Sequence, residues 1–135
     1  MRVIKFKAKC VDSGEWIAGN LVSYREDDGR DIVCIVSDHR NDIDACLEFT
    51  EVDPDTVCQF TGLYDSKGRE IYEGDTFSLG EHVIKVVYEA DRSSFVLRMI
   101  GQRNWLLPLD KLFCKSDNDG ICGNIYDKQD FLNKK

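Results

Sequence analysis

Length, composition and charge already narrow the class of protein. The chain has 135 residues, which suffices for one compact domain or for two very small ones that share a core. Its 42% hydrophobic and 32% charged residues, with 2 prolines, are typical of a globular protein and exclude a disordered or collagen-like chain. The formal net charge of -7 disfavours generic nucleic-acid binding, because a phosphate backbone is repelled on average.

The first half of the chain predicts a β-hairpin followed by further strands. Ile4–Cys10 alternates apolar and basic residues, which is the period-2 pattern of a strand with one buried face. Turn residues follow, and Trp16–Tyr24 predicts the returning strand. Ile32–Val36 is a β-branched run typical of a fully buried strand. Residues 42–52 fit either a strand or a short helix, because short apolar patterns do not separate the two.

Regularly spaced turns from residue 57 onward predict a small barrel. Its strands would be Asp75–Leu79, His82–Glu89, Phe95–Ile100, Trp105–Leu107 and Ile121–Tyr126. Pro108 restricts the fourth of these strands to a sheet edge or to its own end, because proline has no N–H to donate. An aspartate cap begins a predicted short C-terminal helix over Asp127–Leu132. The predicted fold class is therefore mainly β, a β-rich α+β protein.

The cysteines are expected to be reduced thiols. There are six of them, Cys10, Cys34, Cys46, Cys58, Cys114 and Cys122. The chain begins Met-Arg-Val-Ile-Lys-Phe without the apolar run of an export signal, so we expect a cytoplasmic protein with unpaired thiols. No Cys-x-x-Cys pair occurs and only His39 and His82 could assist, so neither a zinc site nor a redox site is predicted. No segment approaches the ~20 apolar residues that cross a bilayer, so no membrane partner is expected.

Four segments form a specific combination. They are the central block Val52–Asp75, the basic opening Ile4–Ala8, Trp16 with Gly19, and Ile121–Tyr126. The block contains the run Thr-Gly-Leu-Tyr-Asp-Ser-Lys-Gly-Arg-Glu-Ile-Tyr-Glu-Gly-Asp, which is long and unusual. This combination resembles the YopX family of phages and prophages, and the segments together span nearly the whole chain.

The resemblance implies an architecture and an origin more than an activity. It implies a β-rich oligomerisation region over residues 1–61 and an SH3-like small β-barrel over residues 62–135. It also implies self-association, and the family has no established biochemical activity. Cys122 stands where the family tolerates Ile or Val, so a small buried side chain is expected there, and the other thiols are most simply buried as well.

The central block has a structural and a functional interpretation. Structurally, residues 65–68 form a turn, glycines supply backbone freedom, and strands are fixed by the polar side chains of Gln59, Thr61, Glu70 and Asp75. Functionally, an oligomer seam or a peptide groove would be lined by Gln59, Thr61, Tyr72 and Glu73. The structural interpretation is favoured, because turn residues serve turns first.

Asp38 and His39, with Asp42 and Asp44 nearby, form the one cluster that could act as an acid-base or metal site. Their spacing does not match a calcium loop, and solvated loop charge explains them better. Neither a nucleophile elbow nor a phosphate-binding glycine motif occurs. We therefore predict no catalytic set, no metal and no cofactor, and a hydrolase using Asp38 and His39 is a distant third hypothesis.

The basic opening strand is the remaining candidate surface. Lys5, Lys7 and Lys9 could grip phosphates, protect a sheet edge from unwanted pairing, or form ion pairs between subunits. The last two roles are favoured because the overall charge opposes nucleic acid. Trp16 and the apolar run Ile32–Val36 have few elements to cover them, so we expect a second chain to cover them. The leading hypothesis is a non-catalytic homo-oligomeric module that binds a host or phage protein, and the alternative is a nucleic-acid-binding phage accessory protein.

Overall fold

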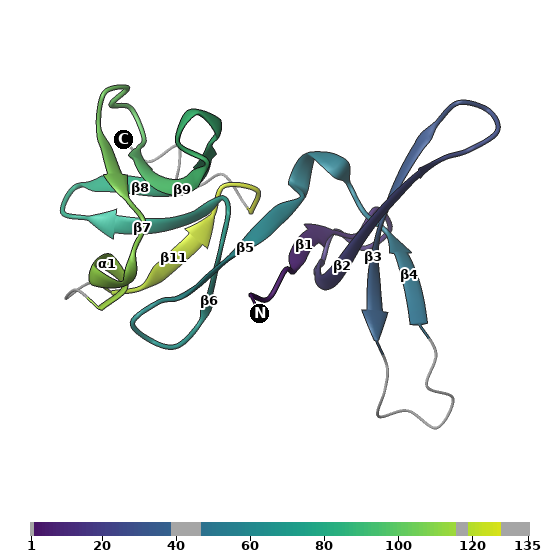
Figure 1. Ribbon diagram of the computed structural model, residues 1–135, viewed down its shortest axis with the longest axis horizontal. Coiled ribbons are helices and arrows are strands. Elements are labelled where there is room, and N and C mark those ends of the chain that lie inside the picture. The colour runs from purple at the N-terminus through teal and green to yellow at the C-terminus, as the bar shows by residue number, and fades with distance from the viewer. Residues whose placement is uncertain (1, 39–46, 116–118, 128–135) are drawn as a thin grey trace. The chain divides into compact units, whose positions relative to one another are not determined.

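The chain is mainly β and divides into two compact units. The computed structural model describes residues 2–38, 47–115 and 119–127 (Figure 1). The units comprise residues 1–59 and 60–135, so they meet two residues before the boundary that the sequence predicts. Each unit has its own hydrophobic cluster. Within the described part of the chain, no helix is long and apolar enough to span a membrane.

The first unit is an antiparallel meander. Its strands are β1 (Phe6–Lys9), β2 (Trp16–Arg25), β3 (Asp31–Asp38) and β4 (Leu47–Glu51). They lie in the order β4-β3-β2-β1, and Figure 1 shows β2 and β3 as a long hairpin. The predicted opening hairpin is confirmed, and the ambiguous segment before residue 52 contains a strand. A short 3-10 helix η1 (Pro54–Thr56) follows β4.

One face of these strands forms the core of the first unit. Ala8, Ile35 and Val52 are at most 1% exposed. Five partly buried apolar residues pack against them, namely Phe6, Ile17, Leu21, Val33 and Val57. Because side chains alternate along a strand, these residues share one side of the sheet. The chain after β4 also returns to β1, where the Asp53 N–H donates a 2.8 Å hydrogen bond to the Lys9 carbonyl.

Gly19 is required where β2 approaches β3. A Cβ atom at this position would collide with the carbonyl oxygen of Val36 and lie 3.1 Å from Cγ2 of Ile35. Any larger residue would therefore push β2 and β3 apart.

β5 (Cys58–Tyr64) leads from the first unit into the second. Its first residues pair with β1, and its later residues pair with β6 (Glu70–Tyr72). The second unit then forms an antiparallel sheet in the order β10-β9-β8-β7-β11. These strands are β7 (Asp75–Leu79), β8 (His82–Glu89), β9 (Ser94–Met99), β10 (Leu106–Pro108) and β11 (Ile121–Asn124). Pro108 ends the edge strand β10, as its missing N–H predicts.

The structure of the second unit does not confirm the predicted barrel. Its edge strands β10 and β11 do not pair with each other in the described residues, so a closed barrel is not confirmed. A helix that the sequence did not predict, α1 (Lys111–Lys115), precedes β11, and a 3-10 turn η2 (Ala90–Arg92) links β8 to β9. The predicted C-terminal helix lies outside the described residues except for Asp127.

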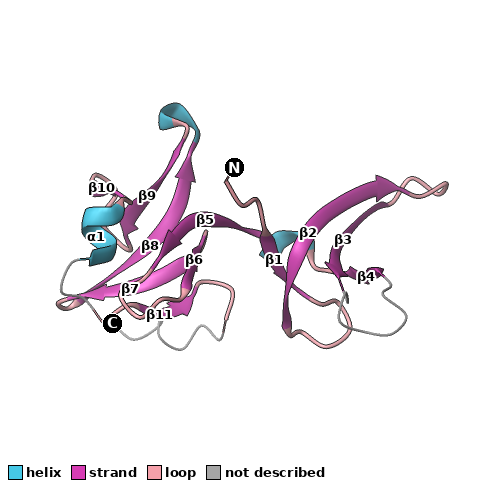
Figure 2. Cartoon of the chain, turned by 60° about the horizontal axis from the view of Figure 1, so that its bottom comes forward, coloured by secondary structure: helices cyan, strands magenta, loops and turns pink. Residues whose placement is uncertain are grey.

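α1 helps to cover the core of the second unit (Figure 2). The Phe113 ring packs edge-on against Phe77, with the ring centroids 5.1 Å apart. The buried cluster consists of Ile71, Phe77, Ile84, Val86, Leu97, Leu109 and Cys114. The helix and the sheet thus bury one continuous apolar core.

Candidate interaction surfaces

The structure brings the basic opening strand and Trp16 together. Lys9 lies opposite Trp16 in the register of β1 and β2. The ammonium nitrogens of Lys7 and Lys9 lie 4.6 and 5.4 Å from the centroid of the Trp16 ring, within the range of cation–π attraction. Lys5 precedes β1 and is partly buried.

The predicted role of these lysines in edge protection is wrong. β1 lies between β2 and β5, so it is an interior strand of its sheet. An interior strand has no free edge to protect. The lysine side chains instead stand on the face of the sheet that points away from the core, because Phe6 and Ala8 point into it.

That face, here called the outer face, carries apolar side chains beside the lysines. By alternation it carries Trp16, Val22, Tyr24, Ile32, Cys34, Val36 and Phe49, none of which belongs to the core cluster. The three residues from β3 are at most 9% exposed, whereas Tyr24 and Phe49 are 48% and 59% exposed. Burial, together with the Glu51 carboxylate, raises the pKa of the Cys34 thiol. Both faces of the first sheet therefore carry apolar side chains.

The four candidate residues of the central block lie on β5, on β6 and directly after β6. Gln59 pairs with Phe6 in the first unit, whereas Thr61, Tyr72 and Glu73 belong to the second. The Thr61 hydroxyl donates to the Ile71 carbonyl at 2.8 Å. Tyr72 is 5% exposed, and its hydroxyl donates to the Glu70 carboxylate at 3.0 Å. Burial and this carboxylate raise the pKa of Tyr72. Thr61 and Tyr72 are thus engaged inside the second unit.

The Asp65 carboxylate joins the central turn to the last strand. Its side chain is 0% exposed and accepts hydrogen bonds from the backbone N–H groups of Lys67, Arg69 and Ile121 at 2.9, 2.8 and 3.1 Å. Nε of Arg69 donates a further bond at 2.8 Å. Burial alone would raise the pKa of Asp65, but these hydrogen bonds outweigh it and hold that pKa below its usual value.

Asp75 makes a second polar connection to β11. Its carboxylate is buried and accepts hydrogen bonds from the Tyr72 N–H at 2.8 Å and from the Asn124 side-chain amide at 2.9 Å. The Ile125 N–H also donates to the Gly74 carbonyl at 2.9 Å. The predicted structural roles of the turn and of Asp75 are confirmed. Sequence reasoning missed Asn124, and its only signal was a polar residue inside an otherwise apolar final segment.

The described cysteines are thiols, but their environments differ from the prediction. Cys10, Cys34, Cys58, Cys114 and Cys122 form no disulfide. Cys122 is exposed, which corrects the expectation of a small core side chain. Its side chain points toward Ser78, on the side of β7 that faces away from the core. Cys10 is half-buried, and the other three are buried. Cys46 lies outside the described residues, so the state of all six thiols stays a prediction.

The predicted acid-base cluster cannot be placed. His39, Asp42 and Asp44 lie outside the described residues, and Asp38 ends β3. Across residues 2–38, 47–115 and 119–127, no group of three or more potential metal ligands comes together.

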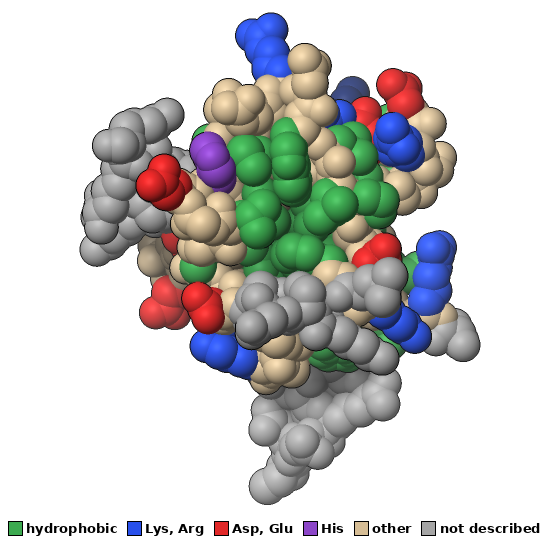
Figure 3. Space-filling model, turned by 90° about the vertical axis from the view of Figure 1, so that its left-hand side faces the viewer, with side chains coloured by type: hydrophobic (Ala, Val, Ile, Leu, Met, Phe, Trp, Pro, Cys, Tyr) green, Lys and Arg blue, Asp and Glu red, His purple; other side chains and the backbone are tan. Residues whose placement is uncertain are grey.

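The second unit presents an apolar surface of its own. Figure 3 shows a patch of hydrophobic side chains on this unit beside a histidine side chain. Leu79 pairs with the exposed His82, and Leu79 and Leu107 are 43% and 40% exposed. The register places these residues on the same sheet face as the core, so the patch continues the core to the surface.

Two small antiparallel units linked by one continuous strand define a mainly β protein. The sequence model of the family described as YopX protein matches residues 5–133, so the chain belongs to the YopX family and the resemblance is confirmed. No curated protein matches the chain. Among solved structures, the chain is similar to protein EF1440 from Enterococcus faecalis, with 22% identity over 98% of this chain and 99% of that chain, and a TM-score of 0.49.

Proposed function

We propose that this protein is a non-catalytic, phage- or prophage-derived module that self-associates in the host cytoplasm and binds or assembles proteins. The observation that carries this proposal is the outer face of the first sheet. Tyr24 and Phe49 are each about half exposed there, beside the buried apolar residues of β3. Family membership supports the phage origin, since the resemblance is to proteins of phages and prophages.

The physical argument concerns the two faces of one sheet. An antiparallel sheet in a small unit usually buries one face and leaves the other polar and solvated. In the first unit the inner face holds the core around Ile35, and the outer face carries apolar side chains too. A second copy of the chain would cover the outer face symmetrically, as in most homo-oligomers. Phe49 lies on β4, the edge strand of its sheet, so a partner can approach it from the side.

Light scattering and a pair of matched variants test self-association. We expect the mass of the wild-type protein to be a multiple of 15.5 kDa. Phe49→Lys places a charge on the outer face and should reduce the mass to that of one chain. Tyr64→Lys is the control, because Tyr64 is an aromatic residue of the second unit with a similar exposure of 51%. A wild-type monomer at tens of micromolar, or equal loss of mass in both variants, would contradict the proposal.

We also propose that the second unit is a small barrel of SH3-like type with a C-terminal helix. Five antiparallel strands that share one core support the barrel, and the aspartate at the start of the predicted helix, Asp127, supports the helix. Backbone amide NOEs between β10 and β11 would indicate closure, and their absence would leave the sheet open.

Nucleic-acid binding is the second candidate function, because Lys7 and Lys9 gather around Trp16. Basic residues beside an aromatic ring are the parts of a single-strand binding platform. However, the ammonium groups already lie over the ring and compete with a base for its face. We therefore expect no sub-micromolar binding of labelled single or double strands at physiological salt. Tight binding that weakens steeply with salt and is lost in Lys7→Gln would transfer the proposal to this function.

A further inference from the structure

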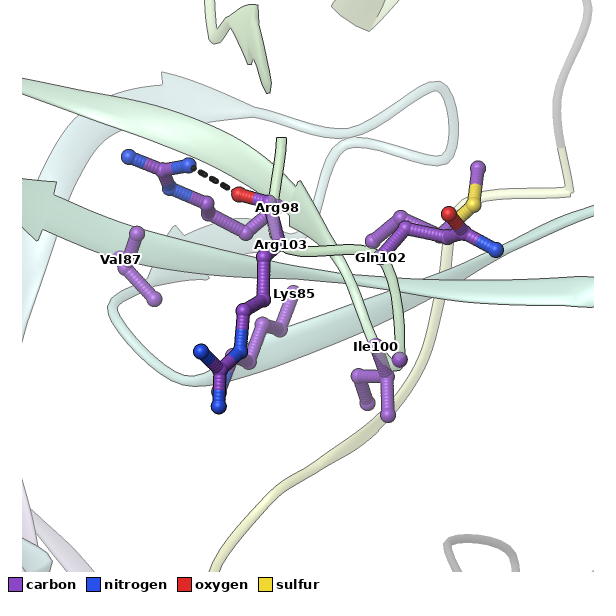
Figure 4. A pocket seen from close by; sticks show the side chains of 8 residues that line it. Lys85, Val87, Arg98, Ile100, Gln102 and Arg103 are labelled. Atoms are coloured by element: carbon purple, nitrogen blue, oxygen red, sulfur yellow. Dashed lines mark hydrogen bonds between the residues drawn. The ribbon is translucent and has the colours of Figure 1, made fainter. Parts of the chain in front are cut away.

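A basic cleft lies on the second unit. It has a volume of about 500 Å³ and is formed by β8, β9 and the turn that follows β9. Figure 4 shows the side chains around it, which include Lys85, Val87, Arg98, Ile100, Gln102 and Arg103. Lys85, Val87 and Arg98 stand on the sheet face that points away from the core, since their strand neighbours Val86 and Leu97 belong to the core.

Like charges are placed directly opposite each other in this cleft. Lys85 on β8 pairs with Arg98 on β9 in the register of the two strands. Directly opposed like charges destabilise a sheet. Arg103 adds a third cation from the turn. Three cations therefore converge in one cleft of a chain whose net charge is -7.

Internal partners neutralise only one of the three cations. Nη2 of Arg98 donates to the Glu89 carboxylate at 2.7 Å, and Nη1 donates to the Arg103 carbonyl at 3.1 Å. These bonds orient Arg98 and tie the turn to β9. The side chains of Lys85 and Arg103 make no ion pair or hydrogen bond with a described residue. The cleft is thus preformed and carries uncompensated positive charge.

A second cavity beside the cleft shows on which side the positive charge stays uncompensated. Arg98 and Arg103 also line a second cavity of about 530 Å³, together with Arg92 and with the acidic residues Glu89 and Asp91. Glu89 and Asp91 therefore supply negative charge in the second cavity. The first cleft has no acidic residue among its lining residues, so it is the side suited to an anionic ligand.

We propose that this cleft docks an acidic segment of a partner protein, in which carboxylates alternate with small apolar side chains. Lys85 and Arg103 would pair with the carboxylates, because complementary charge across an interface favours and orients binding. Val87 and Ile100 line the same cleft and would contact the apolar side chains. The cleft has no aromatic lining residue on which a nucleotide base could stack, which favours a peptide over a single-stranded nucleic acid.

This docking site is independent of self-association through the outer face. The cleft lies in the second unit and the outer face in the first. Binding to the cleft is measured with a peptide and self-association is measured as mass, so either can fail without the other.

The experiment measures fluorescence anisotropy of a short labelled peptide in which Glu alternates with Val, added to the full-length protein. We expect saturable binding that weakens with salt. Lys85→Glu and Arg103→Gln should each weaken it by about tenfold or more, as for loss of a complementary interface charge. Lys67→Glu is the control, because Lys67 is exposed in the same unit but does not line the cleft.

Stability provides a second readout for the same site. Lys85→Glu replaces a like-charge pair with an opposite-charge pair across β8 and β9, so its thermal midpoint should rise while peptide binding falls. A merely structural lysine would not show this opposite pair of effects. The proposal is overturned if the peptide does not bind, if Lys67→Glu weakens binding as much as Lys85→Glu, or if a labelled oligonucleotide binds more tightly than the peptide with the same dependence on Lys85.

Discussion

The two units use different interactions to hold their last strands in place. In the first unit Thr56 is the one buried polar residue among those described, and the core is otherwise apolar. In the second unit the buried polar residues are Asp65, Asp75, Thr76 and Asn124. The hydrogen bonds of Asp65, Asp75 and Asn124 connect the central block to the region around β11. Buried polar groups therefore anchor strand β11 in the second unit.

Chain connectivity explains this difference. Strands β1 to β4 follow one another as neighbours, so each hairpin turn and the apolar pattern set the register. β11 must instead return to β7, and their pairing has a register shift between Ile121 and Gly123. A strand of four residues with an irregular register buries few apolar side chains. Specific hydrogen bonds then select its position, because a buried polar group without its partner is costly.

The two tryptophans allow the units to be compared in one experiment. Trp16 lies in the first unit, and Trp105 packs against the core of the second. In Trp16→Phe the fluorescence reports only on the second unit, and in Trp105→Phe only on the first. Urea unfolding of these two backgrounds gives each unit its own transition.

The largest expected effect comes from truncating one buried core side chain in each unit separately. Ile35 and Leu97 are both 0% exposed, one in each unit. Ile35→Ala should lower the unfolding free energy of the first unit by about 3 kcal/mol, and Leu97→Ala should do so in the second. Each should leave the transition of the other unit unchanged. Identical shifts of both transitions would mean that the chain unfolds as one cooperative body.

A smaller effect is expected from the buried carboxylate. Asp65→Asn should lower the unfolding free energy of the second unit by about 2 kcal/mol, because an amide cannot accept all the hydrogen bonds that now reach the carboxylate. Asp31→Asn is the control, since Asp31 makes an exposed ion pair with Arg25. If the two variants lose similar stability, the carboxylate is not the anchor of β11.

The Asp65 carboxylate should also make the stability of the second unit depend on pH. The pKa of Asp65 is lower in the folded state than in the unfolded state, so the unfolded chain binds the proton more readily. The contribution of Asp65 is complete above the unfolded value of about 4 and is lost as the pH falls through the lower folded value. Urea titrations of the second unit from pH 6 downward should show this loss, and Asp65→Asn should show less of it.

The smallest expected effect distinguishes steric crowding from backbone strain at two glycines of the second unit. Gly68 and Gly120 both have a φ of +81°, which strains any other residue. A Cβ at Gly68 meets nothing within 4 Å, whereas one at Gly120 lies 2.8 Å from Oδ2 of Asp65. Gly120→Ala should therefore cost about 1 kcal/mol more than Gly68→Ala. Equal losses in the Trp105 transition would show that the site around Asp65 tolerates a methyl group.

Sequence reasoning succeeded where the signal is local. The alternation in Ile4–Cys10 predicted β1, and the turn at residues 65–68 was expected from its residue types. It missed α1, because five residues are too few to show a helical period. It also misplaced β1 at an edge and Cys122 in the core, because neighbours in a sheet are chosen by pairing between distant segments.

The features of the candidate surfaces also divide into those that local sequence determines and those that only the tertiary structure decides. The sequence by itself determined the mainly β character, the family, and the basic strand with Trp16, since these depend on residue type and on spacing over a few positions. Only the tertiary structure decided that Lys7 and Lys9 cover the Trp16 ring, that Asp65 anchors the Ile121 N–H, and that Lys85, Arg98 and Arg103 share a cleft. The physical reason is distance along the chain. Asp65 and Ile121 are separated by 56 positions, and only the folded strands bring such residues within reach of a hydrogen bond.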